Sequence, residues 1–404
     1  MAESPESIVI VGGGLAGAKA AEALREQGYD GPVTLLAAED ELPYERPPLS
    51  KGYLAGKDEF EKAVVHPEAW YAEHRVDLRR GTEVTAIDRA AHEVELADGT
   101  RLPYGVLILA TGAEPRSLPI PGAETALTLR THADSDRLKA TFGEGKRLVV
   151  IGAGWIGLEV AAAAREAGTD VVVLEAAGLP LLGVLGPEMG EVFATLHREH
   201  GVDLRLGAKI AEITPSAVRL ADGEELEADA VVLGVGVRPR TELAEAAGLD
   251  VDNGVLVDES LRTSDPDIYA VGDIANHDHP ALGRLRVEHW ATALNQPATA
   301  AAAILGGDAA YDRLPYFFSD QYDFGMEYVG HATRDDTARV VIRGDLDGRE
   351  FVAFWLDDQD RILAAMNVNV WDVPDEVRPL IAAGTVVDPD KLTDPDTAYS
   401  DVGR

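Results

Sequence analysis

Short apolar runs alternate with amphipathic stretches along the first two thirds of the chain. Residues 8–11 (IVIV) form a β-branched run that predicts a strand, and the stretch AKAAEALREQG that follows soon after has the apolar spacing of a helix. The same order returns at residues 147–151 (RLVVI), which precede the helical stretch LEVAAAAREAG. Alternation of strands and helices predicts parallel sheets and therefore an α/β fold.

Both strand-to-helix turns are rich in glycine. The first reads Gly12-Gly13-Gly14-Leu15-Ala16-Gly17, and the second reads Gly152-Ala153-Gly154-Trp155-Ile156-Gly157. In a G-x-G-x-x-G turn the first glycine allows the tight turn, the second lets the backbone approach a pyrophosphate, and the third lets the helix pack on the strand. The start of the helix supplies unpaired N–H groups to the phosphates. Two complete motifs predict two bound dinucleotides.

An acidic residue follows the next predicted strand in each case. Residues 33–36 lead to Glu39, about 20 residues beyond the last glycine of the first turn, and the strand DVVVLE ends at Glu175. A carboxylate at this position accepts hydrogen bonds from the hydroxyls of an adenosine ribose.

The repeat extends beyond the glycine-rich turns. Residues 94–112 and 218–236 share one pattern, in which an alternating strand is followed by an Asp-Gly turn and a buried strand. The turns are Asp98-Gly99 and Asp222-Gly223. The chain therefore carries two similar α/β domains, each with its own hairpin.

Length and charge narrow the function classes. A chain of 404 residues is long enough for two or three domains with buried cores. Its net charge of −35 argues against nucleic acid or an anionic membrane as a partner, although acidity also serves solubility or tolerance of high salt. The N-terminal stretch MAESPESIVIVGGG lacks the features of a signal peptide, so we expect a cytoplasmic protein.

The sequence contains no cysteine. This excludes disulfide scaffolds, zinc–thiolate sites, iron–sulfur clusters bound by this chain, and every thiol mechanism. No metal site is expected.

These motifs together resemble a known family, the FAD-dependent NAD(P)H:ferredoxin reductases that serve oxygenases. The resemblance spans nearly the whole chain. Besides the glycine-rich turns, it rests on residues 42–51 (LPYERPPLSK), 110–112 (ATG), 263–266 (TSDP), 268–273 (IYAVGD), 286–290 (RVEHW) and 318–322 (FSDQY).

The resemblance implies a glutathione-reductase-like architecture, with two Rossmann-like dinucleotide-binding domains and a small α+β C-terminal domain. The FAD-binding domain would be discontinuous, over residues 1–114 and 242–315. The NAD-binding domain would cover residues 115–241 and the C-terminal domain residues 316–404. Independently of the resemblance, the prolines of residues 112–121 (GAEPRSLPIP) indicate a linker.

The resemblance also assigns residues to FAD. Asp273 would bind the ribityl chain, and the backbone N–H of Trp290 at a helix start would stabilise negative charge on the reduced flavin. Without the resemblance, the alternative interpretation of Asp273 is a capping aspartate, and the favoured interpretation of Val84 is a core residue. Glu39 would bind the ribose, a task that Asp40 could share. The full set expected at FAD is Gly12, Gly14, Ala16, Glu39, Arg46, Lys51, Val84, Ala110, Arg130, Asp273 and Trp290.

The second nucleotide would then be NADH, held by Gly152, Gly154, Ile156, Gly157, Glu175 and Gly236. Glu175 would bind the 2′-hydroxyl of NADH and repel the phosphate of NADPH. Residues 176–183 contain no basic side chain, which also favours NADH. The resemblance pairs Lys51 with Glu159 as the catalytic residues, a pair that would orient the nicotinamide amide. The alternative interpretation of Glu159 is an acid near a helix N-terminus that the helix dipole favours.

The predicted function is electron transfer from NADH through FAD to a separate iron–sulfur ferredoxin, which would supply a monooxygenase, in particular a cytochrome P450. Disulfide- and peroxide-reducing relatives need cysteines, and this chain has none. One alternative is an NADH-binding redox sensor resembling apoptosis-inducing factor. Another is an electron donor to a rubredoxin or to a nitrite reductase.

Three further expectations concern the C-terminal region. Phe317 and Phe318 are expected to pack in the core; the alternative, which the resemblance implies, is an aromatic that shields the flavin ring. A basic surface for docking an acidic ferredoxin is expected at Arg284, Arg286, Arg334, Arg339, Arg343 and Arg349. Residues 393–404 (TDPDTAYSDVGR) are polar and rich in turn formers, which predicts a loosely held tail.

Overall fold

The structure is a computed structural model that describes residues 5–404. The chain divides into two compact units. The first unit runs through residue 46, resumes over Phe60–Glu114 and ends with Arg238–Pro315. The second unit comprises Pro47–Glu59, Pro115–Val237 and Tyr316–Arg404. The chain passes from one unit to the other within β8 (Ala113–Pro115) and β16 (Val237–Pro239).

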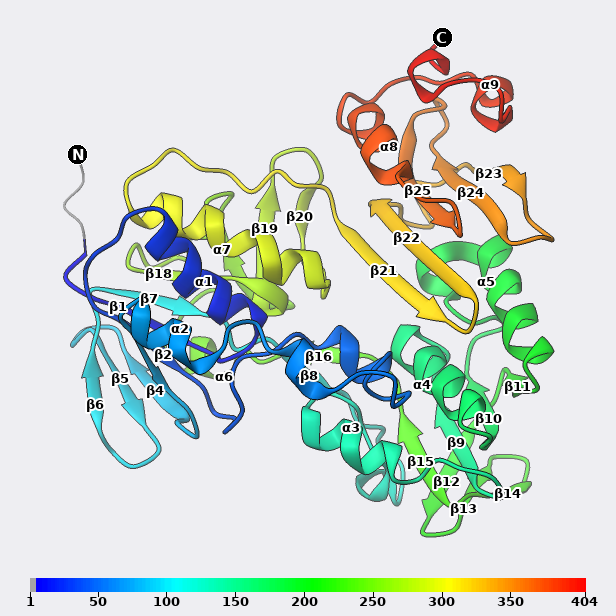
Figure 1. Cartoon of the computed structure of the whole chain (residues 1–404), viewed down its shortest axis with the longest axis horizontal. Helices are drawn as coiled ribbons and strands as arrows, with labels where there is room; N and C mark the ends of the chain where they lie inside the picture. The colour runs from blue at the N-terminus through cyan, green and yellow to red at the C-terminus, as the bar shows by residue number, and fades with distance from the viewer. Residues whose placement is uncertain (1–4) are drawn as a thin grey trace. The chain divides into compact units, whose positions relative to one another are not determined.

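The first unit is built on a parallel sheet with the strand order β18-β7-β1-β2-β3. The strands are β1 (Ile8–Val11), β2 (Val33–Leu36), β3 (Val76–Arg79), β7 (Val106–Leu109) and β18 (Ile268–Ala270). Strand β1 is central and fully buried, which its β-branched sequence favours. Helices α1 (Leu15–Glu26) and α7 (Trp290–Ile304) pack closely side by side through alanine-rich faces (Figure 1).

Smaller elements complete the first unit. They are the antiparallel sheet β4 (Val84–Asp88), β5 (Glu93–Leu96) and β6 (Arg101–Pro103), the sheet β17 (Val255–Val257), β19 (Ala275–His279) and β20 (Gly283–Leu285), and helices α2 (Glu68–Glu73) and α6 (Glu242–Ala246).

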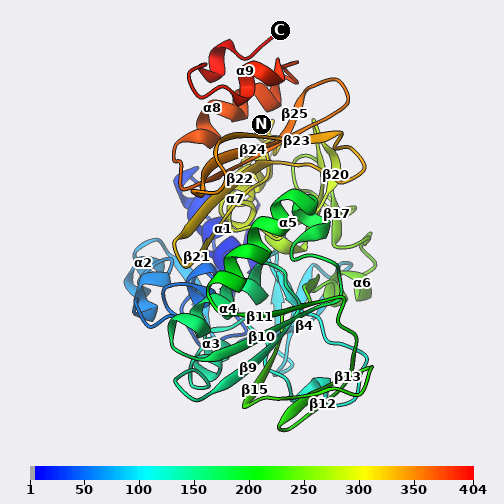
Figure 2. The same cartoon turned by 90° about the vertical axis from the view of Figure 1, so that its right-hand side faces the viewer.

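The second unit contains another parallel sheet, in the order β11-β10-β9-β15. Its strands are β9 (Arg147–Ile151), β10 (Asp170–Glu175), β11 (Asp203–Leu206) and β15 (Ala230–Leu233). Helix α4 (Trp155–Glu166) packs on β9 and β10, and α5 (Leu182–Glu199) packs on β11 (Figure 2). Helix α5 is kinked at Gly186, next to Pro187. Helix α3 (His132–Lys139) begins with a capping box at Thr131.

The internal repeat predicted from the sequence is confirmed. The antiparallel sheet β12 (Ile210–Thr214), β13 (Ala217–Leu220) and β14 (Glu225–Glu227) matches the sheet β4-β5-β6 of the first unit. Each has an irregularity in its first strand pair and an Asp-Gly turn between the second and third strands. Gly99 and Gly223 have φ of +83° and +93°, the left-handed region that glycine tolerates best.

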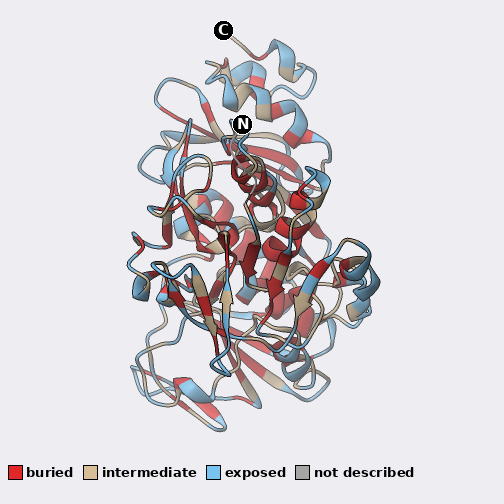
Figure 3. Cartoon of the chain, turned by 90° about the vertical axis from the view of Figure 1, so that its left-hand side faces the viewer, coloured by how far each residue is buried: buried red, intermediate tan, exposed pale blue. Residues whose placement is uncertain are grey.

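The last part of the second unit is an antiparallel sheet in the order β21-β22-β25-β24-β23. It comprises β21 (Tyr316–Gln321), β22 (Phe324–Gly330), β23 (Arg339–Asp345), β24 (Glu350–Leu356) and β25 (Ile362–Val368), with helices α8 (Val373–Ala382) and α9 (Pro389–Thr393). Its apolar side chains share a core with the parallel sheet of the same unit, where Phe193 of α5 contacts Phe324. Figure 3 shows the central strands and helices as the buried parts of the chain.

The expectation of a loosely held tail was wrong. Val402 is fully buried, and the N–H of Asp388 donates to its carbonyl. Arg343 of β23 donates to carbonyl oxygens of Pro395 and Thr397 and lies over the ring of Tyr399. Hydrogen bonds from Arg343 and the backbone, together with the buried Val402, therefore fix this segment.

The α/β fold class is confirmed, with Rossmann-like parallel sheets in both units and an antiparallel C-terminal sheet. Which nucleotide each domain binds, and where its boundaries lie, stays a prediction. Among residues 5–404, no helix is both long and apolar enough to cross a membrane.

Candidate dinucleotide-binding and redox site

The first glycine-rich turn lies at the carboxyl end of β1. Gly12 has φ of +123°, and a Cβ there would collide with the carbonyl of Ala110 at the end of β7. A Cβ at Gly17 would collide with the carbonyl of Gly12. Both glycines are therefore required by the packing of the chain itself.

Gly14 is different, because the packing of the chain does not require glycine there. Its φ of −87° suits any residue, and no atom of residues 5–404 outside its immediate neighbours lies within 4 Å of a Cβ built on it. A side chain would project into open space at the N-terminus of α1. This space and the N–H groups beside it fit the pyrophosphate of a dinucleotide such as FAD.

Glu39 lies beyond β2, in a polar cluster of the first unit. Its carboxylate accepts hydrogen bonds from the Tyr44 hydroxyl at 2.5 Å and from Nη2 of Arg46 at 2.9 Å. Burial alone would raise the pKa of Glu39, but the Arg46 charge and the Tyr44 hydrogen bond lower it below the ordinary value. Burial would lower the pKa of Arg46, but Tyr44 and Glu39 raise it. Glu39 is therefore ionised and oriented.

Asp273 follows β18 in a short turn whose backbone is fixed on both sides. The N–H of Gly272 donates to Oε1 of the buried Gln296 at 2.8 Å, and Nη1 of Arg286 donates to the carbonyl of Asp273 at 3.0 Å. Gly272 has φ of +80°, and a Cβ there would lie 3.0 Å from the Cβ of Ala16. The Asp273 backbone therefore has little freedom beside the start of α1.

The remaining FAD candidates of the first unit also lie at strand or helix ends. Trp290 is the first residue of α7, and its indole Nε1 donates to Oε2 of Glu45 at 3.0 Å. Val84 begins β4 and is buried, and Ala110 directly follows β7. Arg130 belongs to the second unit, where its backbone N–H donates to Oδ2 of Asp134.

The second glycine-rich turn reproduces the first. Gly152 has φ of +101°, and Cβ atoms at Gly152 and Gly157 would meet the carbonyls of Gly234 and Gly152. At Gly154 the nearest atom that a Cβ would meet lies 3.8 Å away, so this position is also open. Ile156, in the first turn of α4, is 41% exposed.

Glu175 ends β10 with its carboxylate held by the backbone. Oε2 accepts from the N–H of Ala153 and Oε1 from the N–H of Ala177, both at 2.7 Å. The carboxylate therefore lies against the second glycine-rich turn, where an adenosine ribose would need an acceptor. Gly236, with φ of +90°, lies between β15 and β16.

Lys51 and Glu159 form a buried ion pair in the second unit. Nζ of Lys51 lies 2.8 Å from Oε1 of Glu159, and the two side chains are only 16% and 3% exposed. Ser50 donates to Oε2 of Glu159, and Ser319 donates to Oε1 at 2.7 Å. The Lys51 ammonium also lies 5.3 Å from the ring centre of Phe318. The pairing predicted from the resemblance is thus present in the structure.

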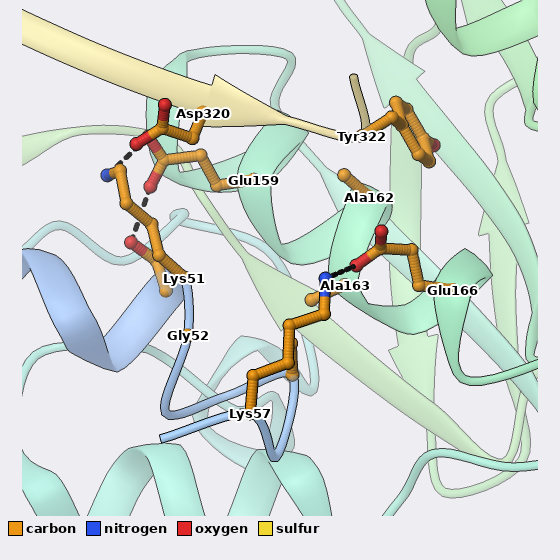
Figure 4. Close-up of a pocket in the computed structure, with 11 residues that line it drawn as sticks. Lys51, Gly52, Lys57, Glu159, Ala162, Ala163, Glu166, Asp320 and Tyr322 are labelled. Carbon is orange, nitrogen blue, oxygen red and sulfur yellow. Dashed lines mark hydrogen bonds and ion pairs between the residues drawn. The ribbon is translucent and has the colours of Figure 1, made fainter. Parts of the chain in front are cut away.

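A small cavity borders this ion pair. Its volume is about 100 Å³, and its lining includes Lys51, Glu159, Asp320 and Tyr322 (Figure 4). Lys57 and Glu166 close another part of the lining through an ion pair of 3.0 Å. The lining of the cavity therefore combines two ion pairs with small side chains.

Phe317 and Phe318 point to opposite faces of β21. Phe317 packs in the core against Trp155 and Tyr328, as expected. Phe318 is only partly buried and faces Lys51, so core packing describes one of the two phenylalanines.

The structure does not support the expected basic docking surface. Arg339 pairs with Asp360, Arg349 pairs with Glu199, and Arg286 pairs with Glu288. Arg343 holds the C-terminal segment, and Arg284 donates to carbonyl oxygens of Val257 and Asn276. Five of the six arginines thus bind different carboxylates and carbonyls and do not form one free positive patch. The sixth, Arg334, is exposed.

Sequence reasoning missed the neutral residues that hold the charged ones. Ser50, Ser319 and Tyr44 contact Glu159 or Glu39, and Gln296 holds the turn before Asp273. The serines and the tyrosine lie inside the motifs LPYERPPLSK and FSDQY, so their position beside charged residues could have indicated a role at the site. No feature of the sequence indicates such a role for Gln296, which lies inside an alanine-rich helix.

Comparisons with known proteins agree with these observations. A family model described as pyridine nucleotide-disulphide oxidoreductase matches residues 6–297, and one described as reductase C-terminal matches residues 316–402. The chain is 44% identical to the ferredoxin–NAD(+) reductase component of the anthranilate 1,2-dioxygenase system of Burkholderia cepacia, over 97% of this chain and 98% of that protein.

Two solved structures match over nearly their whole length. A covalent putidaredoxin reductase–putidaredoxin complex matches with a TM-score of 0.94 and 38% identity, over 99% of this chain and 98% of the other. The ferredoxin reductase for the CYP199A2 system of Rhodopseudomonas palustris matches with a TM-score of 0.93 and 36% identity, over 99% and 100% of the two chains.

The chain therefore belongs to the pyridine nucleotide-disulphide oxidoreductase family, and within it to the ferredoxin reductases. It is an oxidoreductase that uses FAD and NAD(H), as the sequence predicted. Because the chain has no cysteine, it cannot carry out the disulphide reaction that the family's name describes.

Proposed function

We propose that this protein takes electrons from NADH and passes them to a separate iron–sulfur ferredoxin that supplies an oxygenase. The observation that carries the proposal is the combination of two open dinucleotide cradles with a buried Lys51–Glu159 pair in a chain without cysteine. FAD, when bound, supplies the chemistry, because a flavin accepts a hydride and releases electrons singly. The relatives named as ferredoxin reductases support the choice of partner.

Within the first unit, we assign FAD to the cradle of Gly12, Gly14 and Ala16. Glu39 is ionised and oriented by Arg46, which suits an acceptor for ribose hydroxyls. The fixed backbone at Asp273 suits a carboxylate that must hold a flexible ribityl chain.

Within the second unit, we assign NADH to the turn of Gly152, Gly154 and Gly157. The Glu175 carboxylate accepts from backbone N–H groups, which hold it beside this turn. A phosphate at that position would meet a fixed negative charge with no basic side chain in residues 176–183 to compensate. NADH is therefore preferred over NADPH.

Lys51 and Glu159 act on the nicotinamide by orientation and charge. The Lys51 ammonium is fixed by Glu159, and Glu159 is in turn fixed by Ser50 and Ser319. Holding the donor ring in a reactive position contributes to the rate because the orientation is set before the reaction. Neither side chain takes the hydride.

For the final acceptor we propose a cytochrome P450 system. The reductase for the CYP199A2 system supports it, whereas the relative from Burkholderia cepacia belongs to a dioxygenase system. Both kinds of oxygenase receive electrons through a carrier, so the reductase chemistry is the same in either case.

The first experiment mixes the purified flavoprotein anaerobically with NADH or NADPH and follows the flavin absorbance by stopped flow. Rapid bleaching by NADH and a slow response to NADPH are expected. A bound flavin that NADH does not reduce would overturn the proposal. Fast reoxidation by an added ferredoxin supports a reductase, whereas a reduced flavin–NAD⁺ complex that persists in air would instead indicate a redox sensor.

A further inference from the structure

A chain of buried polar side chains runs through the second unit and ends at the Lys51–Glu159 pair. It starts at His197 on α5, continues through Gln321 and Ser319 on β21, and reaches Glu159 on α4. These four side chains are between 0% and 3% exposed. They lie in the unit whose core contains Phe193, Phe324 and Met326.

The direction of each hydrogen bond in this series of side chains follows from which atoms can donate and which can accept. Glu159 is a carboxylate paired with Lys51, so the Ser319 hydroxyl must donate its hydrogen to Oε1 of Glu159, at 2.7 Å. The Ser319 oxygen then accepts from Nε2 of Gln321 at 3.1 Å. The orientation of the Gln321 amide is thereby set.

The same logic continues to the histidine. With its nitrogen toward Ser319, Gln321 presents Oε1 to Nε2 of His197 at 2.8 Å, so Nε2 must carry the hydrogen. Nδ1 is left as an acceptor, and the Tyr322 hydroxyl lies 3.4 Å from it. Burial lowers the pKa of His197 to about 4, which keeps the ring neutral near neutral pH. The hydrogen bonds therefore all point toward Glu159.

The backbone explains why these residues meet. Ser319 and Gln321 are two positions apart on β21, so both lie on its buried face, while Asp320 between them lies on the opposite face and lines the cavity. Helix α4 packs on the same strand and presents Glu159 to it. Apolar side chains could fill the same volume, so a fully connected polar chain is not needed for packing.

We propose that His197 and Gln321 are positioning residues for the redox reaction. Through Ser319 they fix the carboxylate of Glu159, and through Glu159 they fix the ammonium of Lys51. The inference rests on the proposed function, in which the Lys51–Glu159 pair orients the nicotinamide. It adds that α5, which carries neither member of the pair, sets the geometry of that pair.

The test compares His197→Phe, which keeps a ring but removes the donor, with His197→Gln, which keeps an N–H donor. Stopped flow with the FAD-loaded enzyme gives the rate constant of flavin reduction and the Kd for NADH. His197→Phe is expected to lower the rate constant about tenfold with the Kd for NADH within about twofold, since a misplaced orienting group costs rate rather than binding. His197→Gln is expected to recover most of the loss.

His200→Phe is the matched control. His200 follows α5 and stacks on Tyr322 with ring centres 3.7 Å apart, but it makes no hydrogen bond in the chain to Glu159. The rate constant of this variant is expected to equal that of the wild type. If His197→Phe does not fold, Ser319→Ala breaks the chain at its other end with a smaller change in volume and is expected to give the same loss.

A second readout does not depend on turnover. In the oxidised holoenzyme with ¹⁵N-labelled histidine, the NMR signals that disappear in His197→Gln identify His197. They are expected to show the neutral ring with hydrogen on Nε2. Gln321→Leu is expected to change this signal, because it removes the acceptor.

The outcomes separate the two proposals. A hydrogen on Nδ1, or wild-type rate constants in both His197→Phe and Ser319→Ala, overturns the positioning role and leaves the reductase function standing. A wild-type flavin that NADH does not reduce overturns both. Loss of rate in His197→Phe and Ser319→Ala, recovery in His197→Gln and no change in His200→Phe support the inference.

Discussion

The replacement Gly14→Ala tests the FAD assignment directly. Gly14 has φ of −87° and ψ of −170°, which alanine adopts without strain, and the added Cβ would meet no described atom within 4 Å. Such Gly→Ala changes stabilise a protein by about 0.4–1 kcal/mol, because the unfolded chain loses freedom. The apoprotein should therefore fold at least as well as the wild type.

The same methyl group would occupy the space through which a pyrophosphate approaches the N-terminus of α1. Loss of one charge-assisted hydrogen bond costs about 1.5–3 kcal/mol. With tenfold in Kd for every 1.4 kcal/mol, the affinity for FAD should fall by about 10- to 100-fold. Titration of the apoprotein with FAD, followed by flavin fluorescence, measures this change.

The twin glycine provides the control. The space around Gly154 is also open, so Gly154→Ala should weaken the binding of NAD⁺ while the affinity for FAD stays at the wild-type value. Gly12→Ala should instead destabilise the fold, because its φ is +123° and its Cβ would collide with Ala110. Wild-type affinity for FAD in Gly14→Ala would refute the assignment of the first cradle.

Three further predictions concern the second unit. Glu175→Ala should weaken NADH binding by about tenfold, because a charged hydrogen-bond acceptor is lost, and should reduce the preference for NADH over NADPH. Stopped-flow Kd values for both nucleotides measure this change. An unchanged preference for NADH would contradict the role of Glu175. Lys51→Met should lower the free energy of unfolding, measured in urea, by about 3–5 kcal/mol, because Glu159 stays buried and charged without its partner. The double variant Lys51→Met with Glu159→Leu should lose less of this free energy. Equal losses in the two variants would contradict the coupling between Lys51 and Glu159. The pKa of His197 is lowered to about 4 by burial, so the unfolded chain binds a proton that the folded one does not, and stability should fall as pH drops from about 6.5 to 4. Relative to His197→Gln, the free energy of unfolding of the wild type, measured in urea, should fall by about 3 kcal/mol over this pH range, at about 1.4 kcal/mol per pH unit. Parallel pH profiles of the two proteins would show that His197 does not cause the pH dependence.

The local patterns of the sequence were sufficient to predict two nucleotide-binding folds. A β-branched strand, a G-x-G-x-x-G turn and an amphipathic helix depend on short-range geometry, so they can be recognised without knowing the tertiary structure. The Asp-Gly turns at Asp98 and Asp222 depend on the conformational freedom of a single glycine. The missing cysteines exclude thiol chemistry in any fold.

Predictions that depended on the surroundings of a charged or polar side chain succeeded less well. Arg339, Arg343 and Arg349 are close in sequence, but the strands and loops direct them toward different partners. The C-terminal segment looked like a tail because only one of its side chains, Val402, is buried, and the hydrogen bonds that hold the segment come from residues far away in the sequence, such as Arg343. Long-range pairing decided both cases.

By itself, the sequence determined the two glycine-rich strand-to-helix turns and the acids at or shortly after the end of the next strand, because each depends on one short segment. The composition alone excluded thiol chemistry. Only the tertiary structure decided how Lys51, Glu159, Ser319, Gln321 and His197 combine, since they come from segments far apart in the chain. The physical reason is burial. A polar group removed from water needs a partner, and the fold determines which distant residue supplies it.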